Sequence, residues 1–198
     1  MNQILIHEVD LFPSKLGIVD FSSIINLKDL IADCMLVKSN DSSRTLSNRG
    51  GFQSNNIERG KYNSLDNLSD LIVRCGNSFM SSKSDIELVM DNCWLNINPK
   101  YSYNTDHIHP DSLISGTFYI QTPDNSGNLV FSRSDNFYNL LWSIAQNSSS
   151  PFFSSEQSVT PKPGMLVLFG SWETHSVEQN LSDEERISFS FNLKPKPL

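Results

Sequence analysis

The sequence is poor in cysteine, with only Cys34, Cys75 and Cys93 among its 198 residues. They are odd in number, lie far apart and form no C-x-x-C pair, so they do not suggest a disulfide framework. We therefore expect buried free thiols in a reducing cytoplasm.

Basic residues are also few, because 15 Lys and Arg stand against 22 Asp and Glu, which gives a formal net charge of −7. Proteins that bind nucleic acids usually carry a basic face, so this balance argues against a phosphate backbone as the main partner. The simplest role of the negative charge is to keep the protein soluble.

Long apolar runs are absent. The N-terminal stretch MNQILIHEVDLF is short and is interrupted by His7, Glu8 and Asp10. It predicts neither a signal peptide nor a membrane span, and no later run reaches the length of a span. We expect a cytoplasmic protein without a membrane partner.

The length suits one domain, which we divide into strands and supporting helices over 1–84 and a jelly-roll core over 85–198. The spacing of apolar residues predicts helices over 22–38, with Ser22 or Ser23 as N-cap, and over 64–82. Residues 3–21 suggest one or two strands around a turn at Pro13.

Most strand-like segments lie in the second half of the chain. They are short, rich in β-branched and aromatic residues, and separated by Pro, Gly, Asn and Asp. The predicted strands are 86–98, 112–121, 128–132, 164–170 and 186–194, with a long polar excursion over 134–160. This pattern predicts a β-dominated α+β fold, a jelly roll with the N-terminal helices packed on one sheet.

The chemistry is carried by three of the four histidines. His107 and His109 are two residues apart, which places them on one face of an extended chain, and Pro110 favours that extended conformation. His175 follows the apolar strand over 164–170. Three such ligands on one face of a metal leave the opposite face open, as in non-haem iron(II) oxygenases.

Two ligand sets fit this spacing. One consists of His107, His109 and His175. The other uses His109, Asp111 and His175, which gives the commoner arrangement of two histidines and one carboxylate. In the second case His107 would only orient another ligand.

Arg186 lies eleven residues after His175, at the start of the last predicted strand, and shares a face with Ser188. A guanidinium binds a carboxylate through two parallel hydrogen bonds, and a serine hydroxyl can add a third. This would hold the distal carboxylate of 2-oxoglutarate while its keto-acid end binds iron. The alternative is a surface ion pair with Asp183, Glu184 or Glu185, which would contribute little.

Several stretches along most of the chain resemble the 2-oxoglutarate/iron(II) oxygenases of a type common in marine bacteria and their phages. The resemblance rests on H-x-H-P followed by S-G-x-x-Y, on G-x-L-V-L-F-x-S-W-x-x-H-S-V and on R-I-S-x-S-F-N. The matching stretches are LFPSKLGIVDF at 11–21, SNRGGFQS at 47–54, 94–120, 163–180 and 186–192. Gly170 stands where the family usually has proline, a change that we expect to be tolerated.

The resemblance implies a double-stranded β-helix of the cupin-like kind, with Fe(II), 2-oxoglutarate and O2 as cofactor and cosubstrates. It favours His107, His109 and His175 as the metal ligands. It also implies hydroxylation of a substrate with formation of succinate and CO2.

Further residues are candidates for the pocket. Tyr119 could bind the cosubstrate or could be a core aromatic residue. Gly50 and Gly51 could form a turn that carries Phe52 and Gln53 toward the site. The remaining candidates for a substrate pocket are Trp172, Asn96 and Asn192.

Two other functions stay open at this point. A three-histidine cupin-type metalloenzyme would not use 2-oxoglutarate, and a non-enzymatic jelly-roll module would not need a tightly bound metal. The substrate could be a small molecule or a protein side chain. Strand edges in small jelly rolls often pair, which would allow a homodimer.

Overall fold

The computed structural model describes residues 7, 14–133 and 154–197. The helices are α1 (Leu27–Asn40) and α2 (Asn63–Ser81). The strands of the first half are β1 (Gly17–Asp20), β2 (Asn48–Arg49), β3 (Phe52–Gln53) and β4 (Leu88–Asn98). Those of the second half are β5 (Tyr103–His107), β6 (Ile114–Gln121), β7 (Leu129–Ser132), β8 (Glu156–Val159), β9 (Met165–Gly170), β10 (His175–Val177) and β11 (Arg186–Pro195).

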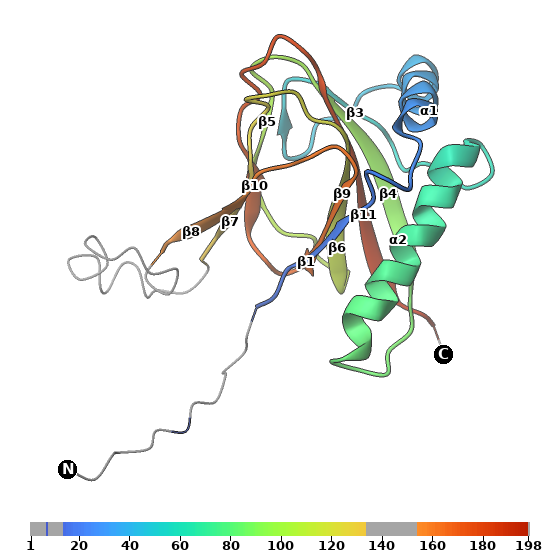
Figure 1. Cartoon of the computed structure of the whole chain (residues 1–198), viewed down its shortest axis with the longest axis vertical. Coiled ribbons are helices and arrows are strands. Elements are labelled where there is room, and N and C mark those ends of the chain that lie inside the picture. Colours follow the sequence, from blue (N-terminus) through green and yellow to red (C-terminus); the bar gives the residue numbers. More distant parts are fainter. Residues whose placement is uncertain (1–6, 8–13, 134–153, 198) are drawn as a thin grey trace.

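The strands form two antiparallel sheets that face each other, and both helices cover the outer face of one of them (Figure 1). The six-stranded sheet has the order β1-β9-β6-β11-β4-β3, and the five-stranded sheet has the order β2-β5-β10-β7-β8. This arrangement confirms the predicted β-dominated α+β fold, a jelly roll with the helices on one sheet. No helix of the described chain is long and apolar enough to cross a membrane.

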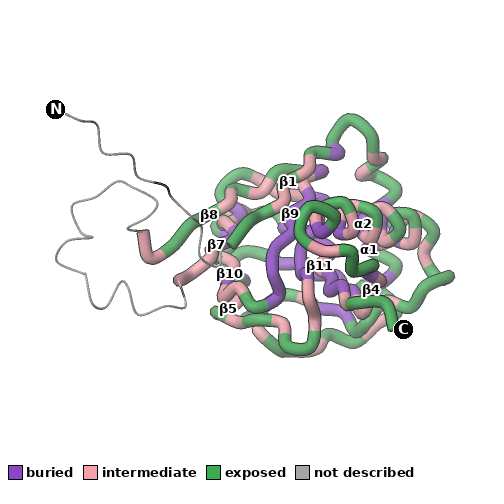
Figure 2. Tube along the Cα trace, turned by 90° about the horizontal axis from the view of Figure 1, so that it is seen from below, coloured by how far each residue is buried: buried purple, intermediate pink, exposed green. Residues whose placement is uncertain are grey.

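Side chains alternate between the two faces of β11, and this alternation creates two different interiors. Ile187, Phe189, Phe191 and Leu193 point toward the helices and join the main hydrophobic core. The same face of β4 contributes Cys93, Leu95 and Ile97 to that core. Figure 2 shows this buried layer between the helices and β11. The other face of both strands carries mainly polar residues, together with Trp94 of β4, and these lie between the sheets.

The first helix begins later than predicted. Asn26, not Ser22 or Ser23, is its N-cap, and the Asn26 side chain accepts a hydrogen bond of 3.1 Å from the Lys28 N–H. The residues before it form a turn, because the N–H groups of Ile24 and Ile25 both donate to the Phe21 carbonyl. Residues 22–26, which the apolar spacing had assigned to the first turn of the helix, therefore precede α1.

The second helix matches its prediction closely. Leu65, Leu68 and Ile72 are buried against the sheet, as their spacing indicates. The five strands predicted in the second half of the chain are also present, with bounds that agree within about two residues.

Four short strands outside the predicted excursion were not predicted, namely β2, β3, β5 and β10. Each has five residues or fewer and little apolar character, so no apolar alternation could develop. Of the predicted excursion over 134–160, residues 156–159 form β8 beside β7, and residues 134–153 lie outside the described residues. Within the range 3–21, β1 forms a strand over Gly17–Asp20, while the predicted turn at Pro13 and the residues 1–6 and 8–12 lie outside the described residues.

Gly50 and Gly51 connect the two sheets. Both have positive φ, at 70° and 72°, which glycine adopts without strain. They take the chain from β2 in one sheet to β3 in the other. A Cβ on Gly51 would lie 2.9 Å from the Ile97 carbonyl oxygen, so the close approach to β4 also requires glycine.

Candidate metal centre and anion pocket

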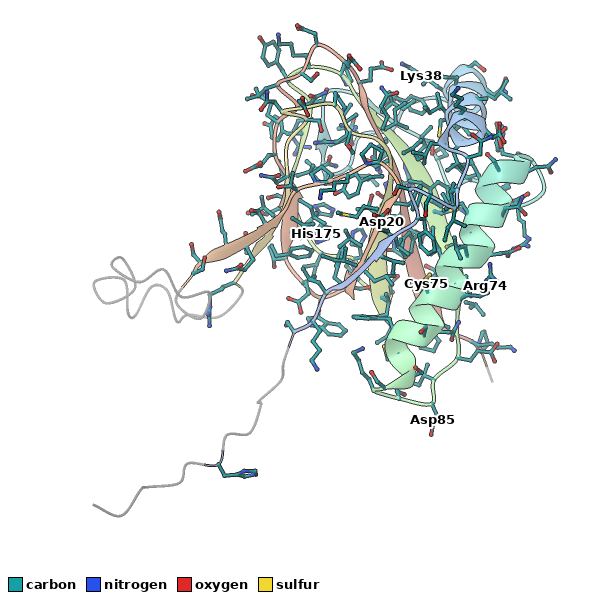
Figure 3. The ribbon with its side chains drawn as sticks, in the orientation of Figure 1. Asp20, Lys38, Arg74, Cys75, Asp85 and His175 are labelled. Atoms are coloured by element: carbon teal, nitrogen blue, oxygen red, sulfur yellow. The ribbon has the colours of Figure 1, made fainter. Side chains whose placement is uncertain are left out.

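The three predicted histidines come together between the sheets. His107 at the end of β5 and His175 at the start of β10 are directly paired across these antiparallel strands. His109 lies just beyond β5, where its N–H donates to the Ser171 carbonyl over 2.9 Å. Figure 3 places His175 between the sheets, on the other side of the six-stranded sheet from Arg74 and Cys75 of α2.

Backbone carbonyls fix the tautomers of two of these rings. The Nδ1–H of His107 donates to the Thr105 carbonyl over 2.8 Å, and the Nδ1–H of His175 donates to the Glu173 carbonyl over 2.8 Å. A carbonyl oxygen can only accept, so each Nε2 keeps its lone pair. The His175 Nε2 lies 3.2 Å from the His109 Nε2.

One potential ligand atom from each histidine lies within 4.8 Å of the others. This cluster, His107, His109 and His175, is the one group of three or more metal-binding side chains among the described residues. Imidazole nitrogens suit iron, zinc, copper and nickel. Hydrogen bonds from the second ring nitrogen to carbonyls are typical of metal-binding histidines. The donor set therefore fits a transition metal.

Burial keeps these rings neutral. Burial, together with a smaller effect of the neighbouring histidines, lowers the pKa of His109 to about 3 and that of His175 to about 4. The pKa of His107 is also lowered, mainly by burial. Neutral imidazole is the form that binds a metal, so no proton has to be displaced near neutral pH.

Aromatic side chains pack around the cluster. The Phe169 ring lies edge-on to His175 with 4.7 Å between centroids, and Phe131 lies on it at 6.1 Å. The Trp94 ring lies 5.6 Å from that of His109. These contacts restrict the rotation of two imidazoles and limit access of water to them.

Asp111 lies apart from this arrangement. It is exposed, has a φ of 67° in the turn after β5, and is not a member of the histidine cluster. Aspartate tolerates this left-handed conformation better than most residues do. Its place in the turn gives a local reason for an aspartate at this position.

Arg186 lies in the same pocket as the histidines and is only 1% exposed. Its Nη1 donates to the carbonyls of Ser126 and Glu178, the latter over 3.3 Å. The alternative of a surface ion pair is wrong, because Asp183 pairs with Lys100 and Glu185 pairs with Lys38.

Arg186 forms no ion pair with a carboxylate of the described residues. Burial lowers its pKa. A buried cation needs a compensating anion, because desolvation of an unpaired charge costs several kcal/mol. The site therefore fits an anionic ligand, and the carboxylate of 2-oxoglutarate is such an anion.

Ser188 and Tyr119 line the pocket beside Arg186. They are paired residues of β11 and β6. Burial raises the pKa of Tyr119 to about 12, so its hydroxyl stays protonated and can donate to an anion.

Sequence reasoning missed several residues of this pocket, and alternation along the strands could have found them. Asn98 lies two residues beyond Asn96 on β4 and is paired with Arg186. Its Nδ2 is buried and makes no hydrogen bond with the described residues. Thr117 on β6 and Ser190 on β11 follow the same rule. Each shares a strand face with a residue that was predicted.

The four candidates for a substrate pocket lie in different places. Asn96 lines the histidine pocket, where its Nδ2 donates to Ser190 over 3.0 Å. Gln53 is buried but does not line that pocket. Trp172 is 60% exposed and packs over Gly170. Asn192 is buried, and its amide is bonded to Ser115 and Asn92.

A larger groove lies elsewhere, between α2 and β4, with a volume of about 750 Å³. It contains Cys93 and the Arg59–Asp70 ion pair but none of the three histidines. The thiol of Cys93 is held protonated, because burial raises its pKa to about 11. Since the one cluster of metal-binding side chains among the described residues lies in the smaller histidine pocket, we assign the chemistry to that pocket.

Comparison with known proteins agrees with this assignment. Residues 92–192 match the family described as "Putative 2OG-Fe(II) oxygenase". This range contains all three histidines, Arg186 and Ser188. No match was found among the curated protein sequences.

Solved structures with a similar fold have low sequence identity. A Pseudomonas putida prolyl-4-hydroxylase is 15% identical with a TM-score of 0.65, and the match covers 92% of this chain and 93% of that one. The viral collagen prolyl hydroxylase of Paramecium Bursaria Chlorella virus-1 is 13% identical with a TM-score of 0.61, covering 91% and 96%. HygX of Streptomyces hygroscopicus is 10% identical with a TM-score of 0.62, covering 92% and 84%.

Proposed function

We propose that this chain, which belongs to the 2OG-Fe(II) oxygenase family, is a dioxygenase that uses 2-oxoglutarate and Fe(II) to hydroxylate a small molecule or a protein side chain. The observation that carries the proposal is the shared pocket of the histidine cluster and Arg186. Three neutral nitrogen donors and a buried cation that has no carboxylate partner in the described part of the chain fit a metal and an anionic cosubstrate side by side.

Each part of the pocket has a defined task in this proposal. His107, His109 and His175 would hold Fe(II) through their Nε2 atoms. Arg186 would bind the far carboxylate of 2-oxoglutarate through charge-assisted hydrogen bonds, with Ser188 and the protonated Tyr119 as further donors. When both are bound, they supply the oxidising chemistry, in which O2 and 2-oxoglutarate give succinate, CO2 and a hydroxylated substrate.

The remaining residues would order the site rather than react. The carbonyls of Thr105 and Glu173 hold two imidazoles in the tautomer that presents Nε2. Phe131, Phe169 and Trp94 exclude water from the side of the metal, which protects a reactive site from side reactions.

The substrate class stays broad in this proposal. Two similar structures are prolyl hydroxylases, and HygX has been crystallised with nickel, 2-oxoglutarate and hygromycin B. Proteins of this fold thus act on protein or bind a small molecule. Both classes are retained here.

The direct test is anaerobic addition of Fe(II) and 2-oxoglutarate to the purified protein. We expect a visible charge-transfer band that needs both additions, and slow succinate formation when air is admitted without substrate. A folded protein that shows no band at saturating concentrations would contradict the proposal.

A three-histidine metalloenzyme that does not use 2-oxoglutarate is the second candidate, and it is favoured by the absence of a carboxylate from the cluster. The Arg186→Ala variant separates the two. It should abolish succinate formation in a 2-oxoglutarate enzyme but leave the activity of the alternative enzyme nearly intact. A non-enzymatic module would bind no metal tightly, and His175→Ala would then have no effect on its function.

A further inference from the structure

A chain of buried hydrogen bonds lies beside the histidine cluster and crosses four segments of the fold. The Ser171 and Ser115 hydroxyl oxygens are 2.7 Å apart, and the Ser115 hydroxyl donates to the Asn192 Oδ1 over 2.7 Å. The Asn192 Nδ2 donates to the Asn92 Oδ1 over 2.9 Å. Because the Ser115 proton is used for Asn192, Ser171 must be the donor to Ser115.

These polar groups are deeply buried, with Ser115 at 0%, Ser171 at 1% and Asn192 at 7% exposure. They belong to β6, to the β9–β10 connection and to β11, while Asn92 belongs to β4. On the helix-facing side of the same strands, the corresponding positions are apolar. Burial of this many polar groups is tolerated only when each has a partner, so the chain of bonds has few alternative arrangements.

Ser171 connects this chain to the metal centre. Its carbonyl accepts the His109 N–H over 2.9 Å, and its N–H donates to the Leu113 carbonyl over 3.1 Å. The Ser171 backbone is therefore hydrogen-bonded to both ends of the turn that carries His109. It also lies four residues before His175, in the connection whose Glu173 carbonyl orients the His175 ring.

We propose that Ser115, together with Asn192 and Ser171, forms a set of positioning residues that fixes the distance between His109 and His175. The proposal rests on the metal site of the proposed function. The hydrogen bonds between these side chains hold Ser171 against β6 and β11, and the Ser171 backbone holds the turn that carries His109. None of the three side chains lines the histidine pocket, so none is required to touch metal, cosubstrate or substrate.

Ser115→Ala is the sharpest test, because it removes one oxygen from a side chain that contacts no ligand. The readout is a titration of the metal-free protein with Co(II) alone, followed by absorption spectroscopy. We expect roughly tenfold or greater weakening of Co(II) binding, as for other partners that orient metal ligands. Ser171→Ala should also weaken Co(II) binding, because it removes the other hydroxyl of the Ser171–Ser115 hydrogen bond.

Ser54→Ala is the matched control. Ser54 is also fully buried, and its hydroxyl makes two hydrogen bonds, to the Asn55 carbonyl and from the Leu95 N–H. It lies outside the histidine pocket. This variant should lower the thermal midpoint about as much as Ser115→Ala does, yet bind Co(II) like the wild type.

Wild-type Co(II) affinity in folded Ser115→Ala and Ser171→Ala would overturn the proposal. Equal weakening in Ser54→Ala would also overturn it, because the effect would then reflect general stability. Succinate formation by the wild type is measured separately. Its absence would contradict the proposed function, while the Co(II) titrations would still decide whether the serines position the histidines.

Discussion

Arg186 and Asn98 face each other as directly paired residues of β11 and β4, with both side chains buried in the histidine pocket. Side chains of paired residues in antiparallel strands point to the same face. The Asn98 Nδ2 has no hydrogen-bond partner among the described residues. A buried donor without a partner beside a buried cation defines a place where an anion can be held by both.

Asn98→Ala should therefore weaken 2-oxoglutarate binding. Loss of one hydrogen bond to a charged group corresponds to about 1.5 kcal/mol, or roughly tenfold in Kd. Arg186→Gln removes the charge itself and should have a larger effect, on the order of a hundredfold. The measurement is calorimetric titration of the protein with 2-oxoglutarate in the presence of Mn(II).

Asn77→Ala provides the comparison for Asn98→Ala. The Asn77 amide of α2 donates to the carbonyls of Val73 in the same helix and of Leu88 in β4, outside the histidine pocket. It should lower stability without changing the Kd for 2-oxoglutarate. An unchanged Kd in Asn98→Ala would mean that its amide does not contact the cosubstrate.

The choice between two ligand sets can be decided with His107, His175 and Asp111. If the three histidines bind the metal, His107→Ala and His175→Ala should each reduce affinity for Co(II) by several orders of magnitude. Asp111→Asn should leave it unchanged, since asparagine also accepts the positive φ at this turn. Strong loss of Co(II) binding in Asp111→Asn, with little loss in His107→Ala, would favour the set with a carboxylate.

The sequence was most informative where a strand is long and one face is uniformly apolar. β11 alternates over its whole length, and that alternation correctly placed Arg186 and Ser188 on a common face opposite Ile187. The strand β4 pairs with β11, and Asn96, opposite Ser188, lies on the same face and lines the pocket. The histidine pair at 107 and 109 was recognisable because two residues apart means one face of an extended chain.

Other parts of the site depend on contacts that spacing does not encode. Asn192 and Asn96 both lie in strand-like runs, but only the fold determines that one is bonded to Ser115 and the other lines the pocket. Trp172 is close to His175 in sequence, yet it packs over Gly170 and is largely exposed. Asn98 was missed because its role follows from its pairing with Arg186.

Close packing requires the glycine of the S-G-x-x-Y motif, Gly116. A Cβ at this position would lie 2.3 Å from the Val167 carbonyl oxygen and 2.4 Å from the Phe191 ring. Neither can move easily, since one is backbone and the other is a fully buried side chain. Gly116→Ala should lower the free energy of unfolding by about 3 kcal/mol, measured by urea denaturation.

Gly60→Ala is the comparison for this prediction. Unlike Gly116, Gly60 has a positive φ, at 89°, and no atom lies within 4 Å of a Cβ there. Its cost should be limited to backbone strain, about 1 kcal/mol. Equal stability of the Gly116→Ala and wild-type proteins would show that β6 can move away from its neighbours.

The buried thiols of Cys34 and Cys93 should make the free energy of unfolding depend on pH in alkaline solution. Burial raises the pKa of Cys34 to about 12 and that of Cys93 to about 11, from an ordinary value of 9.0. Above pH 9 the unfolded chain therefore releases protons that the folded protein retains. The stabilising effect is complete below pH 9 and is lost as the pH rises toward the folded pKa values.

The free energy of unfolding should consequently fall between pH 8 and pH 10, by about 1.4 kcal/mol for each of the two thiols at the upper limit. Urea denaturation at both pH values measures this difference. Cys34→Ala should be less stable than the wild type at pH 8 because of the cavity. Its free energy of unfolding should fall less between pH 8 and pH 10, because the contribution of one of the two thiols is missing. Since all other titrating groups are shared, an identical pH dependence in the two proteins would place the Cys34 thiol in an ordinary, solvated environment and contradict its burial on the inner face of α1.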